Sequence, residues 1–118
     1  MPYVYEYPLS PDARWQLFRL WCDANPVMLG EMEQKAVSLE KAGHKHISAQ
    51  YLMEWARYEL PYKSVPIPYR DGEGKMRSFR INNNDAAALG RWLVMRHPEL
   101  PIELRKSALD ERAQPCTS

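Results

Sequence analysis

The sequence predicts an α+β fold that is mainly α, with a helix-turn-helix pair followed by a β-hairpin wing and a fourth helix. Three observations predict this class. Apolar residues recur at helical spacing in four segments. Ser-Pro and Asn-Pro pairs stand where helices would begin, and one segment between two helices alternates with a period of two. This order of elements is winged-helix-like, although it also arises in other small α+β domains.

The first two helices are introduced by the same kind of residue pair. Ser10-Pro11 precedes the first helix and Asn25-Pro26 the second, because Ser and Asn cap helices and Pro is favoured at the first helical position. Gly43 ends the second helix, as glycine commonly does just past a helix C-terminus. Cys22 falls in the aromatic part of the first helix and is predicted to be a buried thiol.

A third helix is predicted over residues 49–60, where Ser48 can cap its start and Pro61 stops it. The turn before this helix contains His44 and His46, and alternate histidines can share a metal ion. No third ligand at a standard spacing completes such a site. We therefore predict a polar turn here and no metal.

A hairpin is predicted over residues 64–82, where apolar and polar residues alternate. Its turn signal is the run Asp71-Gly72-Glu73-Gly74. Pro66 and Pro68 are expected to confine its first strand to the edge of the sheet, because proline cannot donate to a neighbouring strand.

The Asn82-Asn83-Asn84 run is predicted to connect the hairpin to a fourth helix over residues 85–97, with Asn84 as its cap. The chain then divides into an extended N-terminal arm (1–9), a single globular domain (10–105) and a polar C-terminal tail (106–118). The tyrosines of the arm are expected to pack on the body. No apolar run approaches the roughly 20 residues that span a bilayer, and the start shows no secretory signal pattern. We therefore expect a cytoplasmic protein without membrane contact.

Charge gives a local signal for nucleic acid and no global one. The net charge is +1, but residues 44–80 hold seven Lys and Arg against four Asp and Glu. In a winged helix, the helix at 49–60 would lie in the major groove of DNA and the hairpin would contact its backbone. The predicted base-reading residues are Gln50, Glu54, Arg57 and Tyr58. The predicted phosphate contacts are Lys45, Arg70, Lys75, Arg77 and Arg80.

Other functions stay open beside DNA binding. Glu54 and Glu59 would repel phosphate on a groove-facing helix, and seven tyrosines with a near-neutral charge suit a protein-binding surface. The plainer interpretation is a helix pair with a solvated face, in which the tyrosines cover the core. A phosphate loop, a zinc-protease motif and a nucleophile elbow are all missing. We predict that the protein is not an enzyme and has no catalytic residues and no cofactor.

A set of landmarks resembles a family of small proteins encoded by tailed bacteriophages, over roughly residues 13–105. The first landmarks are Trp15, Phe18, Trp21, Asn25, Pro26, Gly43, Ile47, Ser48 and Trp55. The later ones are Phe79-Arg80-Ile81-Asn82-Asn83-Asn84, Ala88, Arg91, Trp92, Pro98-Glu99-Leu100, Glu103 and Arg105. The chain departs from the family at the two prolines of the first hairpin strand and in the 106–118 tail.

The resemblance implies a phage or prophage origin and no established activity. Small phage accessory proteins are often transcription regulators or inhibitors of host machinery. We therefore expect the protein to act in the cytoplasm of a bacterial host, with double-stranded DNA or a host protein complex, such as a defence system, as its partner. A structural role in the virion is a third hypothesis. A homodimer formed through residues 98–118 is also possible, although no heptad pattern supports it.

Overall fold

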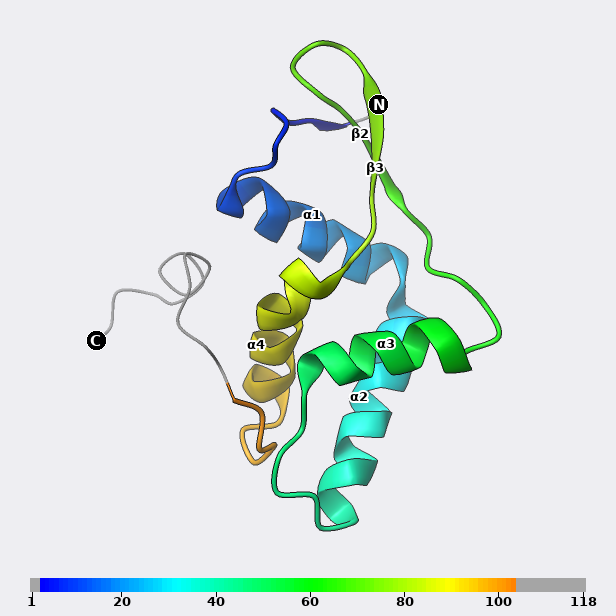
Figure 1. Cartoon of the computed structure of the whole chain (residues 1–118), viewed down its shortest axis with the longest axis vertical. Helices are drawn as coiled ribbons and strands as arrows, with labels where there is room; N and C mark the ends of the chain where they lie inside the picture. The colour runs from blue at the N-terminus through cyan, green and yellow to red at the C-terminus, as the bar shows by residue number, and fades with distance from the viewer. Residues whose placement is uncertain (1–2, 104–118) are drawn as a thin grey trace, which may run out of the picture.

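Residues 3–103 are described by the structure, a computed structural model of the chain (Figure 1). The mainly helical α+β class and the predicted order of helices and hairpin are confirmed. The elements in chain order are β1 (Tyr3–Val4), α1 (Pro11–Ala24), α2 (Pro26–Lys41), α3 (Ala49–Glu59), β2 (Ile67–Arg70), β3 (Met76–Phe79), the short 3-10 helix η1 (Asn83–Asp85) and α4 (Ala86–Arg96). The predicted tail at 106–118, with Cys116, lies outside the described residues.

Two of the predicted helix starts are confirmed in atomic detail. The Ser10 hydroxyl accepts a hydrogen bond from the backbone N–H of Ala13 at 3.1 Å. The Ser48 hydroxyl accepts one from the backbone N–H of Tyr51 at 3.1 Å, and α3 begins directly after Ser48, at Ala49. These side chains satisfy N–H groups that have no partner inside the helix.

The second helix begins at Pro26 as predicted, but its cap and the cap of the fourth helix differ from the prediction. Asn25 precedes α2, but its side chain does not cap it, because its Oδ1 and Nδ2 atoms pair with the backbone of Val65 instead. Asn84 was predicted to cap the fourth helix, and this is wrong. The cap is a reciprocal pair in which Asn82 accepts from the backbone of Asn84 and Asp85 accepts from the backbone of Asn82.

The sheet has three strands in the order β1-β2-β3, with β1 parallel and β3 antiparallel to β2. The prediction that prolines confine β2 to an edge is wrong, because β2 lies in the centre. Asp71 donates its N–H to the Lys75 carbonyl at 2.9 Å, so the N–H at position 71 points toward β3. Because successive backbone N–H groups of a strand point to opposite sides, the nitrogens of Pro66 and Pro68, at even-numbered positions, point away from β3. β1 pairs with β2 only from Tyr69 onward, and the sheet therefore loses no bond at either proline.

The core lies between the helices and extends into the base of the hairpin. α3 packs against α2 and α4, while α1 packs against α2 and β2. Ile67 and Phe79, which face each other across the hairpin, are buried with the helical core. The largest fully buried side chains are Trp21, Phe18, Leu17, Met32, Ile47, Leu52, Leu89 and Leu93.

The N-terminal arm contacts the hairpin through two tyrosine rings. The Tyr5 and Tyr69 rings form a T-shaped pair, with 6.1 Å between ring centres and 74° between ring planes. The Arg77 guanidinium lies 3.5 Å from the centre of the Tyr7 ring. The arm thus adds a strand and two aromatic contacts to the hairpin. Within residues 3–103, no helix has both the length and the apolar character needed to cross a bilayer.

Candidate functional site

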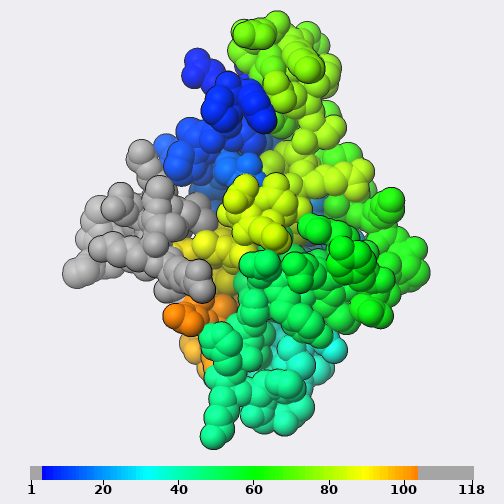
Figure 2. Space-filling model, in the orientation of Figure 1, coloured from blue at the N-terminus to red at the C-terminus, as the bar shows by residue number. Residues whose placement is uncertain are grey.

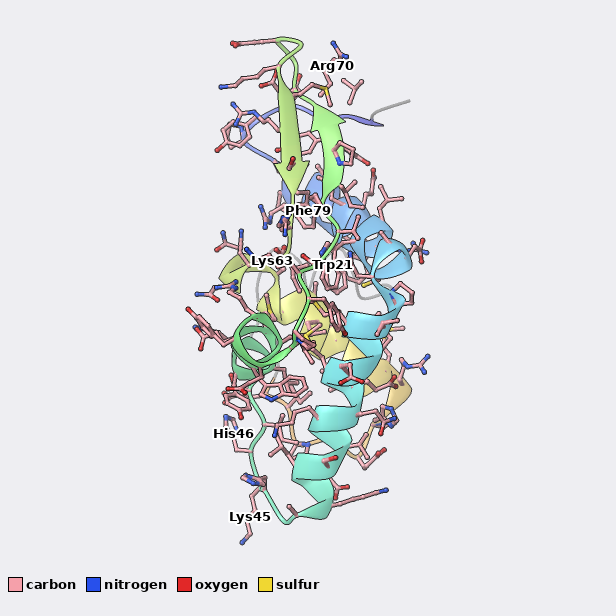
Figure 3. All side chains as sticks on the ribbon, turned by 90° about the vertical axis from the view of Figure 1, so that its right-hand side faces the viewer. Trp21, Lys45, His46, Lys63, Arg70 and Phe79 are labelled. Atoms are coloured by element: carbon pink, nitrogen blue, oxygen red, sulfur yellow. The ribbon has the colours of Figure 1, made fainter. Side chains whose placement is uncertain are left out.

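The nine predicted nucleic-acid contacts do not form one continuous surface. Lys45 lies in the turn after α2, at the opposite end of the molecule from the tip of the hairpin, where Arg70 lies (Figure 3). In the space-filling view the hairpin projects beyond the body, with α3 below it (Figure 2). Arg70 and Lys75 are exposed on this projection. The two ends could not hold the same short stretch of a ligand.

The four predicted base-reading residues share one side of α3. Their positions follow the helical repeat, and the buried residues of α3 take the other side. Gln50, Arg57 and Tyr58 are exposed, whereas Glu54 is half-buried. Their role as base contacts stays a prediction, but the side of the helix that carries them faces solvent.

Arg77 serves the hairpin in this structure. Its Nε donates to Asp71 Oδ2 at 2.9 Å, while Asp71 Oδ1 accepts from the backbone of Glu73 and Lys75. The hydrogen bonds from Arg77 and from the Lys75 backbone hold the pKa of Asp71 below its ordinary value. The Arg77 charge is thus matched by an adjacent carboxylate, and its role as a phosphate contact stays a prediction.

Arg57 and Arg80 come together at a pocket of about 510 Å³. Arg57 reaches it from α3 and Arg80 from the base of the hairpin, and the loop between α3 and β2 lines its remaining side. The lining residues are Trp21, Met28, Met32, Met53, Ala56, Arg57, Tyr62, Lys63, Ser64, Ser78, Arg80, Ile81 and Asn82.

The charged residues that line the pocket are all cations. Three cations line it, Arg57, Lys63 and Arg80, and no Asp or Glu of the described residues does. In that part of the chain none of the three forms an ion pair. Arg80 Nη1 donates to the Ser64 carbonyl at 3.0 Å, which ties the hairpin to the loop. The uncompensated charge makes the pocket suited to an anion.

Two neighbouring backbone contacts fix the loop that carries Lys63. Asn25 accepts from the Val65 N–H at 2.6 Å and donates to the Val65 carbonyl at 3.0 Å. Asn25 also donates to the Trp21 carbonyl at 2.9 Å, and it is buried. Through these three hydrogen bonds, the buried amide of Asn25 holds the loop against the start of α2.

The floor of the pocket is apolar, and one of its residues, Trp21, has a buried N–H donor without an acceptor in the described part of the chain. Met28, Met32 and Met53 line it beside Trp21, and all four are buried. The indole Nε1–H of Trp21 has no hydrogen-bond acceptor among the residues that the structure describes. Leaving a buried donor unpaired costs about 1–3 kcal/mol.

Sequence reasoning missed Lys63 and Trp21 as parts of a site. Lys63 follows a helix-stopping proline, so it was counted only within the basic third of the chain. In the sequence, Trp21 stands out only as a landmark of the family resemblance. The one signal in the sequence is the place of Lys63 between Arg57 of the third helix and the basic hairpin.

The two histidines of the turn before α3 are exposed. Among residues 3–103 no group of three or more His, Cys, Asp and Glu is placed to hold a metal ion. Cys22 is half-buried, which is less than the full burial that its aromatic neighbours predicted. Burial, together with the charge of Asp23, raises the pKa of its thiol to about 12.

No protein-family model, curated protein or solved structure matches the chain. The resemblance to the tailed-phage proteins therefore stays a prediction.

Proposed function

We propose that the protein is a non-enzymatic, phage-derived accessory protein that binds double-stranded DNA in the manner of a winged helix. The observation that carries the proposal is the convergence of three cations at one pocket lined by no carboxylate of the described residues. These cations come from α3, from the following loop and from the base of the hairpin. Unpaired cations are the groups that neutralise phosphate.

In the proposed complex, the exposed side of α3 enters the major groove. Arg57 and Gln50 can make paired hydrogen bonds to guanine and adenine edges. Lys63 and Arg80 contact the adjacent phosphates, and the exposed Arg70 and Lys75 of the hairpin tip extend the contact along the backbone. Lys45 lies at the other end of the molecule and takes no part (Figure 3).

The first test is binding to a random duplex of about 30 base pairs at low and at physiological salt. Each neutralised phosphate contributes about −0.9 to the slope of log affinity against log salt. Phosphate contact by Lys63, Arg80, Arg70 and Lys75 therefore gives a slope of about −3.6. Because phosphate attraction is strongest at low salt, absence of binding there contradicts the proposal.

Sequence-specific reading is tested at a preferred site by Arg57→Ala. We expect affinity to fall by about 1–3 kcal/mol at that site and to fall less at random sequences. Arg19→Ala is the matched control, because Arg19 is exposed on α1 and outside the pocket. Equal binding of every sequence by wild type and Arg57→Ala contradicts the base-reading role.

A second candidate function is inhibition of a host protein complex, and the tyrosines of α3 favour it. Tyr58 is 78% exposed and Tyr51 is 45% exposed, and both lie on helix α3. Aromatic residues in this setting often anchor protein interfaces. This function predicts capture of a host protein that is insensitive to salt and lost in Tyr58→Ser. Salt-sensitive duplex binding with no loss of capture in Tyr58→Ser contradicts it.

A further inference from the structure

We propose that the pocket between α3, the loop and the hairpin base binds a free nucleoside monophosphate. This goes beyond duplex binding and does not require it. The ligand must carry an anion for the cations, a flat apolar body for the floor and a hydrogen-bond acceptor for the indole. Each requirement follows from a different part of the pocket.

The volume and the floor define the body of the ligand. The pocket of about 510 Å³ lies within the range of about 300–1,000 Å³ that small-molecule sites occupy. Three methionines line it, from α2 and α3. Thioether sulfurs make favourable contacts with aromatic rings, and methionine adapts its rotamer to the shape of a ligand. A planar heteroaromatic ring fits this floor.

The polar positions define the charge of the ligand. Two guanidinium groups and one ammonium group favour a doubly charged phosphate over a single carboxylate. The lining hydroxyls of Ser64 and Ser78 are placed at the same pocket and can hydrogen-bond a sugar. A fatty acid, with one negative charge and no hydroxyls, leaves most of these groups unused.

The buried indole distinguishes a nucleobase from an alkyl chain. The Trp21 N–H has no acceptor in the described part of the chain, and its side chain is 0% exposed. The ring nitrogens and carbonyl oxygens of a base are acceptors, whereas an alkyl chain has none. Contact between a base edge and this N–H requires the neighbouring methionines to change rotamer, which methionine does readily.

The test is titration of the full chain with adenosine monophosphate at constant ionic strength, followed through the ¹⁵N-labelled indole N–H signals. The chain has four tryptophans, and Trp21→Phe assigns the signal of Trp21. We expect a saturable shift of that signal in the wild type. Lys63→Gln should weaken binding about tenfold, because it removes a charged hydrogen-bond donor. Lys45→Gln, which removes the same charge outside the pocket, should leave the affinity unchanged.

Adenosine, inorganic phosphate and dodecanoate separate the parts of the ligand. Weaker binding of adenosine and of phosphate than of the monophosphate supports the proposal. Binding of dodecanoate without the monophosphate overturns it, and so does equal loss in Lys63→Gln and Lys45→Gln. No shift of the Trp21 signal in a protein that still binds duplex overturns this inference alone. Monophosphate binding without duplex binding leaves this inference standing and removes the DNA-binding function.

Discussion

At the residue scale, Glu33 shows how one carboxylate joins two helices. Its Oε2 accepts from Arg96 Nε at 2.7 Å and lies 2.6 Å from His97 Nε2, so α2 is tied to the end of α4. Burial alone raises the pKa of Glu33, but hydrogen bonds from Arg96 and His97, and their charges, leave it below its ordinary value. The folded protein therefore holds this carboxylate ionised to lower pH than the unfolded chain.

This shift predicts a pH dependence for Glu33→Gln. Because the folded pKa is depressed, the stabilisation is fully present above the ordinary value of 4.5 and is lost as pH falls through the folded value. At neutral pH we expect Glu33→Gln to lower the free energy of unfolding by about 1 kcal/mol. Urea unfolding at neutral and acidic pH measures the difference in free energy of unfolding between wild type and variant. This difference should become smaller in acid.

The control for the Glu33 prediction is Glu73→Gln, because Glu73 is exposed at the hairpin turn. The free energy of unfolding of Glu73→Gln should differ little from that of the wild type at every pH, as for most surface substitutions. A Glu33→Gln gap that stays constant from neutral to acidic pH contradicts the role of the ionised carboxylate.

At the element scale, the hairpin depends on its turn. Gly74 has a φ of +85°, in the left-handed region that favours glycine. The N–H of Gly74 donates to the Asp71 carbonyl at 3.0 Å, which closes the turn between β2 and β3. Gly72, two residues earlier, does not have a positive φ. Substitutions at these two glycines of one turn can therefore be compared, since only Gly74 has the left-handed backbone.

We expect Gly74→Ala to destabilise the protein by about 1–2 kcal/mol, because a side chain is strained in the left-handed region. Gly72→Ala should be neutral or stabilising by about 0.4–1 kcal/mol, through the entropy of the unfolded chain. Its new Cβ would lie 3.9 Å from Glu6 Cγ, an ordinary contact. Thermal unfolding of both variants measures the difference, and equal melting temperatures contradict the turn assignment.

The elements also show which parts of the fold the sequence predicts. Ser10 and Ser48 were predicted as caps because a helix N-cap is decided by a few neighbouring residues. The central position of β2 was not predicted, because it depends on an N-terminal strand from a distant part of the chain. The cap before α4 was misplaced by two residues, since any asparagine of the Asn82-Asn83-Asn84 run could accept the hydrogen bond.

At the scale of the whole molecule, contacts between distant segments decide the site. Asn25 fixes Val65 across 40 residues, and Arg14 pairs with the buried Asp85 across 71 residues. No spacing rule finds such pairs, because sequence patterns report neighbours along one element. The contact between Asn25 and Val65 holds the loop that carries Lys63, so the sequence shows the charge of Lys63 but not which residues lie beside it. The sequence shows each cation separately, and only the folded molecule brings Arg57, Lys63 and Arg80 to one pocket.

The central claim is that Lys63 and Arg80 bind phosphate from one pocket, and a pair of double variants tests it most directly. Lys63→Gln/Arg80→Gln and Arg19→Gln/Lys45→Gln each remove two positive charges, the first pair inside the pocket and the second outside it. Duplex affinity is measured as a function of salt for both. We predict that the pocket variant loses affinity and that its salt slope becomes smaller by about 2, while the control matches the wild type. Equal losses in the two variants would show that only net charge matters and would contradict the account.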